Sequence, residues 1–228
     1  MGIIEDERSS ALVSGVRAGR TNKTRSLRSR SEYESFRPSV KRSPEVLVKI
    51  SGFTKGGFHL KAHMSYVSRK GNINIEDEEG SIFRDLDSIQ SMAKAWQREI
   101  DEGNPPKTNR RDAVRMVLSM PPGTDPMALK KAVRQFAKET FDNHAYVFAL
   151  HTDEKHPHVH LTVQMRGFDG ERLNPRKKDL QNWREALAAC LLDEGVDCVA
   201  TPRASRTRGY ERERTTSKSK VEEQTSVL

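Results

Sequence analysis

The stretch AYVFALHTDEKHPHVHLTVQM, residues 145–165, indicates the fold more clearly than any other part of this 228-residue chain. Two segments rich in β-branched, aromatic and aliphatic residues, 145–151 and 158–165, flank a short polar loop. Such segments are typical of β-strands, and a loop this short joins strands that run antiparallel. The stretch therefore predicts two neighbouring strands of an antiparallel sheet.

Outward from this stretch, short apolar segments alternate with segments of helical periodicity. Further strands are predicted at 46–52, 73–77 and 113–120, and helices at 58–70, 86–102, 125–141 and 177–194. Because two strands follow each other late in the chain without a helix between them, the sheet is expected to be antiparallel. The predicted fold class is therefore α+β.

Two of the predicted helices carry recognisable end signals. Gly71 is a natural stop for the helix 58–70, which would place Arg69 and Lys70 in its last turn. Either Asp87 or Ser88 is expected to cap the start of the helix 86–102.

The net charge of +8 is concentrated at the two ends of the chain. Residues 1–44 contain 10 Lys or Arg against 5 Asp or Glu, and residues 203–228 contain 7 against 4. Both ends are rich in Ser and Arg and have too few apolar residues to offset the entropy cost of ordering. We predict disordered basic tails at 1–44 and 203–228 around one folded domain at 45–202. A basic excess favours polyanionic partners.

Membrane-spanning and disulfide-rich classes are excluded by composition. No apolar run approaches the roughly 18–20 residues that a membrane helix needs. The N-terminus lacks the basic and apolar segments of a signal peptide. Cys190 and Cys198 form neither a disulfide framework nor a metal motif. We expect a soluble protein of a reducing compartment.

Histidines are concentrated on one face of a predicted strand. Because side chains alternate along a strand, His158 and His160 share a face, while Val159 and its apolar neighbours face the core. Two imidazoles at this spacing can converge on one borderline metal ion. A straight strand cannot add His156 as a third ligand, so we expect His151 on the neighbouring strand to supply it. Three ligands leave open positions, which favours a catalytic site.

Two further residues near the histidines are candidates for supporting roles. Asp153 could accept a hydrogen bond from a ligand ring and fix its orientation. His156 is expected to be an outer group of the site or a DNA contact. His59 and His63 lie one helical turn apart and, with Tyr66, could share a helix face, but we interpret both mainly as polar helix residues.

Tyr66, in MSYVSRKGN, is the tyrosine best placed for chemistry. Tyr33 and Tyr210 lie in the predicted tails, and Tyr146 lies on the opposite strand face from His151, where it is expected to pack in the core. A phenol has an unperturbed pKa near 10, and a metal on a neighbouring phosphate would make that phosphate more electrophilic.

The histidine pattern and the segment around Tyr66 resemble those of a known family. His158-Val159-His160 resembles the histidine–hydrophobic–histidine signature of the HUH endonucleases. The wider pattern His151-x-Asp153-x-x-His156-Pro-His158-x-His160, with Tyr66-Val-Ser-Arg-Lys-Gly upstream, resembles the relaxases of plasmid mobilisation and conjugation, and most of all the border-nicking endonucleases of T-DNA transfer. The resemblance extends over about residues 46–209 and includes weaker matches around Ser119 and Arg203.

This resemblance implies a central antiparallel sheet flanked by helices and a set of site residues. Tyr66 would be the nucleophile that joins the 5′ end of the nicked strand, and His151, His158 and His160 would hold a divalent ion. Asp153 is the second catalytic candidate, competing with a histidine for the role of proton acceptor. DNA contacts are expected from Arg69, Lys70, Ser119 and His156.

The resemblance also implies a cofactor and partners. The ion would be Mg²⁺ or Mn²⁺, with Zn²⁺ or Ni²⁺ as ions that a structure could contain. The substrate would be single-stranded DNA at a plasmid origin of transfer, with an accessory relaxosome protein and the coupling protein of a type IV secretion system as partners. The protein would reside in the bacterial cytoplasm and could be exported with its DNA. The 44 residues before the first strand and the chain end about 20 residues after the domain depart from the family pattern. They leave open a minimal nickase, a fragment or a protein that needs a partner.

Four alternatives are left open by the residues. A histidine-triad nucleotide hydrolase has a similar alternating pattern, but Pro157 and the upstream tyrosine argue against it. A two-histidine phosphoesterase needs two His-x-Thr/Ser motifs, and His160-Leu-Thr162 is the one that lies on a predicted strand. A replication initiator or transposase commonly has its tyrosine after the histidines. An inactive DNA-binding accessory protein would have lost Tyr66 or a ligand.

Overall fold

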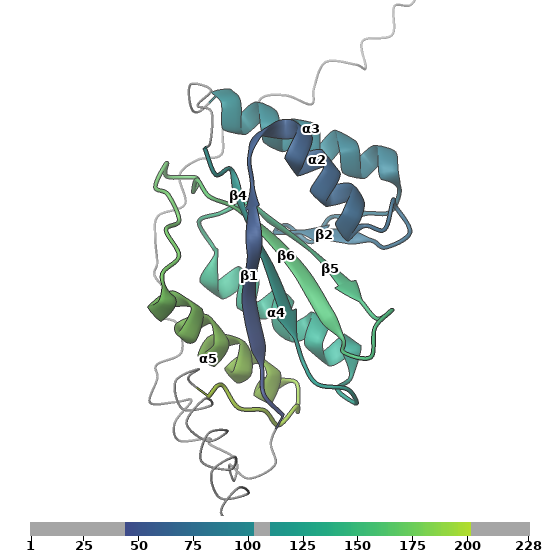
Figure 1. Ribbon diagram of the computed structural model, residues 1–228, viewed down its shortest axis with the longest axis vertical. Helices are drawn as coiled ribbons and strands as arrows, with labels where there is room; N and C mark the ends of the chain where they lie inside the picture. Colours follow the sequence, from purple (N-terminus) through teal and green to yellow (C-terminus); the bar gives the residue numbers. More distant parts are fainter. Residues whose placement is uncertain (1–43, 103–109, 202–228) are drawn as a thin grey trace, which may run out of the picture.

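The structure is a computed structural model that describes residues 44–102 and 110–201 (Figure 1). The tails predicted at 1–44 and 203–228 lie outside the described residues except for Pro44, as do Arg203, Tyr33 and Tyr210. No helix within the described ranges is long and apolar enough to cross a membrane.

A six-stranded antiparallel sheet forms the centre of the molecule. Its strand order is β1-β4-β6-β5-β2-β3. The strands are β1 (Leu47–Thr54), β2 (Ile75–Asp77), β3 (Ile82–Phe83), β4 (Ala113–Ser119), β5 (Tyr146–His151) and β6 (His158–Gln164). With helices on both faces, this sheet confirms the predicted α+β class.

The sheet is covered by helices on both faces, with one core on each side (Figure 1). Helices α4 (Pro126–Thr140) and α5 (Lys177–Asp193) pack on the face that carries Val159. Helices α2 (Gly56–Val67) and α3 (Leu86–Glu102) pack on the opposite face, with Val147 and Ala149. Tyr146 is buried on the α4 and α5 side, as its parity with His151 predicts.

Helix α2 ends earlier than the sequence predicts. Its last residue is Val67, and Arg69 and Lys70 have positive φ angles of 50° and 59° instead of belonging to the last turn. The amide of Lys70 donates to the carbonyl of Ser65 and so closes the helix with a left-handed turn that leads into Gly71, at φ 90°. The prediction that the helix extends to residue 70 is therefore wrong.

The other elements differ from the prediction mainly at their ends. Helix α3 has the predicted bounds, but Asp85, not Asp87 or Ser88, accepts the amide of Ser88 at 2.8 Å. Strand β3 was not predicted, because two residues are too short to show alternation. At the start of α4, Asp125 caps the amides of Met127 and Ala128.

Candidate active site

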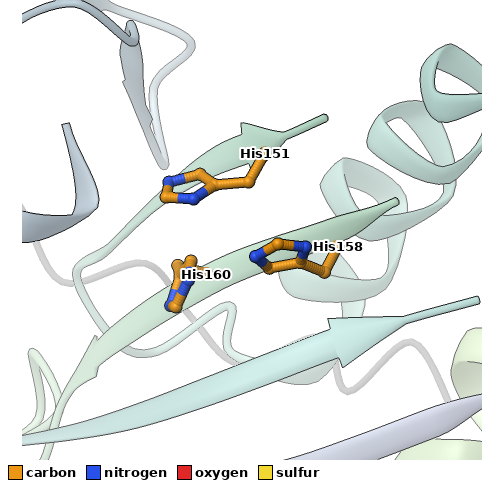
Figure 2. A group of neighbouring side chains, drawn as sticks. All are labelled: His151, His158 and His160. Atoms are coloured by element: carbon orange, nitrogen blue, oxygen red, sulfur yellow. The ribbon is translucent and has the colours of Figure 1, made fainter. Parts of the chain in front are cut away.

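His151, His158 and His160, called here the histidine cluster, converge from two paired strands (Figure 2). In the antiparallel ladder of β5 and β6, His151 is the direct partner of His158, and Ala149 is the partner of His160. One nitrogen of each ring lies within 4.8 Å of the others, and all three side chains are buried. The predicted convergence of these residues is therefore present in the structure.

Two backbone carbonyls orient the rings of this cluster. His151 donates from Nε2 to the carbonyl oxygen of Val67 at 2.6 Å, and His158 donates from Nδ1 to that of His156 at 3.0 Å. The other nitrogen of each ring keeps its lone pair. Nδ1 of His151 is buried and has no hydrogen-bond partner among the described residues. A buried nitrogen without a partner is costly, and a metal ion would satisfy it.

The electrostatic environment favours the neutral form of two rings of the histidine cluster, His151 and His160. Burial is the main cause that lowers the pKa of His160 to about 4, with the neighbouring His151 and His158 adding to it. Burial also lowers the pKa of His151. Neutral imidazole is the form that binds a metal, so these residues fit a divalent cation.

Tyr66 lies beside the histidine cluster at the exposed end of α2. Its ring is 55% exposed and meets the ring of His160 edge-on, with 5.8 Å between the ring centroids. The guanidinium carbon of Arg69 lies 5.3 Å from the centroid of the Tyr66 ring. Tyr66 therefore lies between a member of the histidine cluster and a cationic side chain.

Arg69 connects Tyr66 to the polar loop between β5 and β6. It donates to Asp153 at 2.6 Å, and the second oxygen of Asp153 lies 3.9 Å from Nδ1 of His151. That distance is too long for a hydrogen bond. The expected bond from Asp153 to a histidine ring is therefore absent from this structure, where Asp153 is held by Arg69 instead.

The three other predicted DNA contacts lie beside the cluster or beside Tyr66. Ser119 is the direct partner of His158 in the ladder of β4 and β6, so its side chain is on the same face as the histidine cluster. Lys70 is exposed and lines a shallow hollow with Tyr66. His156 is exposed and contributes its carbonyl to the site.

His63 is the residue that sequence reasoning undervalued. Its side chain is buried, and its Nε2 lies 2.9 Å from the hydroxyl oxygen of Thr162, two residues along β6 from His160. The spacing from His63 to Tyr66, about one helical turn, was the available signal. His59, in contrast, is exposed as expected for a polar helix residue.

A comparison with protein families gives the domain its class. Residues 66–196, more than half of the chain, match the family model "Relaxase: MobA/VirD2-like, nuclease domain". The chain belongs to the MobA/VirD2-like relaxases. The match begins at Tyr66 and includes the entire histidine cluster of this relaxase domain.

Curated relatives of this relaxase are T-DNA border endonucleases. The proteins "T-DNA border endonuclease VirD2" of Rhizobium radiobacter and of Agrobacterium fabrum are each 28% identical over 181 residues. The alignments include 71% of this chain and 43% and 40% of the two relatives. The relaxase chain thus spans less than half the length of these relatives.

One solved structure is also similar. It is described as "Molecular Basis of Vancomycin Resistance Transfer in Staphylococcus aureus", and it aligns with 70% of this relaxase chain and 99% of its own. The TM-score is 0.44 and the sequence identity is 16%.

Proposed function

We propose that this relaxase domain nicks one strand of DNA at an origin of transfer and stays joined to the 5′ end through Tyr66. The observation that carries the proposal is the contact of Tyr66 with His160, a member of a buried cluster of three histidines. A nucleophile and a metal-binding set at one place are the two parts that metal-assisted phosphodiester cleavage needs.

The histidine cluster is proposed to hold Mg²⁺ or Mn²⁺. The free nitrogens left by the two carbonyl hydrogen bonds, and above all the unpartnered Nδ1 of His151, fit a cation. When bound, such an ion would act as a Lewis acid toward the scissile phosphate. Zn²⁺ or Ni²⁺ would fit the same nitrogen ligands.

Tyr66 performs the covalent step of this proposal. Its phenolic oxygen bonds to phosphorus as the bond from phosphorus to the 3′ oxygen breaks, which yields a 5′-phosphotyrosine and a free 3′-OH. The phenol loses its proton and the 3′ oxygen gains one, so the step balances. Arg69 stabilises the developing phenolate, and Asp153, which Arg69 holds near His151, is the proposed proton acceptor.

Contacts with DNA and partner proteins complete the proposal. Ser119 and His156 beside the histidine cluster, and Lys70 beside Tyr66, are proposed to contact the strand on either side of the nick. The proposed partners are an accessory relaxosome protein and the coupling protein of a type IV secretion system. The proposed site of action is the bacterial cytoplasm, with export of the protein together with its DNA.

The test is capture of the covalent product. The full chain is incubated with a labelled library of single-stranded oligonucleotides and Mn²⁺ or Mg²⁺, and any adduct is mapped by mass spectrometry. We expect a DNA adduct on Tyr66 that is lost with chelator and in Tyr66→Phe but kept in Tyr146→Phe, because the hydroxyl of Tyr146 is buried on the other side of the sheet.

A second arm measures the metal directly. Calorimetric titration with Mn²⁺ should show one site that His158→Ala weakens at least about tenfold and that His59→Ala leaves unchanged. An adduct on another tyrosine would contradict the nucleophile assignment. Metal-independent turnover of nucleotide phosphoramidates without an adduct would favour the histidine-triad alternative. DNA binding without either activity would favour an accessory protein.

A further inference from the structure

Arg115 is a cation on the face of the sheet that carries the histidine cluster, and it has no role in the proposed chemistry. In the ladders of β4 it is the partner of Thr162 on one side and of Gly52 on the other. Thr162 follows His160 by two residues on β6. Arg115 therefore lies one strand period, about 7 Å along the sheet, from the row of His160.

The guanidinium of Arg115 is held in place but not neutralised. A Cβ atom at Gly52 would clash with Nη2 of Arg115, so the arginine occupies the space that the missing side chain leaves. Its Nε is buried and has no hydrogen-bond partner, and within 44–102 and 110–201 no acidic group pairs with it. A partly buried cation without a counterion is unfavourable and is well suited to receive an anion.

The groups around Arg115 preserve this unbalanced charge. His63, on α2, is bonded to Thr162, and burial followed by the charge of Arg115 lowers its pKa to about 3. It is therefore a neutral neighbour that neither repels nor neutralises the guanidinium at pH 7. On the opposite side of Arg115, the surface of β1 carries the exposed Lys49, which is paired with Val117 in the row of His160.

The sheet face that carries the histidine cluster and Arg115 is only partly covered by helices. Helices α2 and α3 lie over one end of the sheet, and β1, with β4 beside it, extends beyond them (Figure 1). Leu47 and Lys49 on β1 are exposed there. Leu47 pairs with Ser119 and Lys49 with Val117, so the open part spans the rows of His158 and His160, and Arg115 lies in the next row toward α2.

We propose that the Arg115 guanidinium binds a non-scissile phosphate of the DNA strand, next to the scissile phosphate and on the β1 side of the histidine cluster. The inference rests on the proposed function, because it needs single-stranded DNA as the ligand. Arg115 is a positioning residue in this scheme: its fork of N–H donors fixes the register of the strand so that one particular phosphate meets Tyr66.

The test measures binding apart from chemistry. The full chain with Tyr66→Phe is titrated, in chelator, against a fluorescent oligothymidylate of about 12 nucleotides over a series of salt concentrations. We expect Arg115→Gln to weaken binding about tenfold at low salt and to reduce the salt slope by about 0.7, the value for one lost phosphate contact on single strands. Arg115→Lys should keep most of the slope, because it keeps the charge, while losing part of the affinity.

The control is Lys178→Gln, which removes one charge from α5 on the opposite face of the sheet and should change neither quantity. Thermal unfolding of each variant checks that the fold is kept. The phosphate contact is overturned if Arg115→Gln and Lys178→Gln have the same salt slope. It is also overturned if Arg115→Lys loses as much affinity and as much of the salt slope as Arg115→Gln does.

The outcomes separate this inference from the proposed function. A changed slope in Arg115→Gln together with no Tyr66 adduct in the capture experiment would contradict the chemistry and support the phosphate contact. An adduct on Tyr66 together with an unchanged salt slope in Arg115→Gln would support the chemistry and contradict the phosphate contact. No binding of oligothymidylate by the chain with Tyr66→Phe alone would overturn both.

Discussion

His63 is a buried histidine whose environment in the folded protein disfavours its protonated form. Stability should therefore depend on pH. Burial first, then the charges of Arg115 and His160, lower its pKa to about 3 from an ordinary value of 6.5. Between those pH values the unfolded chain binds more protons than the folded chain, so the free energy of unfolding falls as pH decreases below 6.5. One such group contributes at most about 1.4 kcal/mol per pH unit.

We therefore expect His63→Gln to flatten the dependence of stability on pH between about pH 6.5 and 4.5. Urea unfolding in the presence of chelator at several pH values measures this slope. His59→Gln is the matched control, because His59 lies one turn away on the same helix but is exposed. An identical slope in the two variants would show that His63 titrates normally.

At the same scale, sequence reasoning predicted the convergence of the histidine cluster but not the environment of each ring. The period of a strand and the short loop after His151 are local properties, so the sequence contains them. The choice of free nitrogen depends on the carbonyls of Val67 and His156, and the burial of His63 depends on where α2 crosses β6. These are tertiary contacts that a single sequence does not show.

At the scale of elements, the end of α2 combines two unfavourable backbone conformations. Arg69 and Lys70 both have left-handed φ angles, which cost roughly 1 kcal/mol each for residues with a Cβ. Arg69 has a compensating ion pair with Asp153, whereas the exposed side chain of Lys70 forms no hydrogen bond or ion pair with the described residues. The sequence could not predict this turn, since Arg and Lys are good helix formers.

Lys70→Gly should therefore stabilise the protein by up to about 1 kcal/mol, because glycine adopts this φ angle without steric cost. Chemical unfolding at pH 7 measures the change. The control is Lys61→Gly in the body of α2, which should destabilise the protein by about 1 kcal/mol. Destabilisation of similar size in both variants would mean that residue 70 is helical in solution.

At the scale of the whole molecule, a truncation that tests the N-terminal basic segment must leave the contacts of the folded domain intact. Val199 donates its amide to the carbonyl of Pro44, and Val46 donates to the carbonyl of Val199. A truncation should therefore remove residues 1–43 and keep Pro44. Because these residues contain most of the positive charge excess, we expect weaker DNA binding and a smaller salt slope, with the Tyr66 adduct still formed.

Binding titrations across salt concentrations, together with adduct capture, measure both parts of this prediction. A salt slope equal to that of the full chain would show that residues 1–43 make no contact with the DNA backbone. The comparison also tests the domain boundaries predicted from composition, which the described residues do not address.

The class of the fold was predictable, but its strand order was not. Periodicity identified the elements, and the late pair of strands indicated an antiparallel sheet. The placement of β4 between β1 and β6 depends on long-range pairing, and it is this placement that brings Ser119 and Arg115 to the histidine cluster. Local patterns contain no information on which distant strands become neighbours.

The hydrogen bond from His151 to the carbonyl of Val67 connects strand β5 directly to the end of helix α2. Val67 follows Tyr66 directly, so the residue after the proposed nucleophile holds one of the proposed ligands. A small shift of α2 over the sheet would carry the Tyr66 backbone and the His151 ring in the same direction. This bond adds to the packing of α2 on the sheet in fixing how the two groups are aligned. A change in the position of α2 would therefore move the proposed nucleophile and one proposed ligand as a pair.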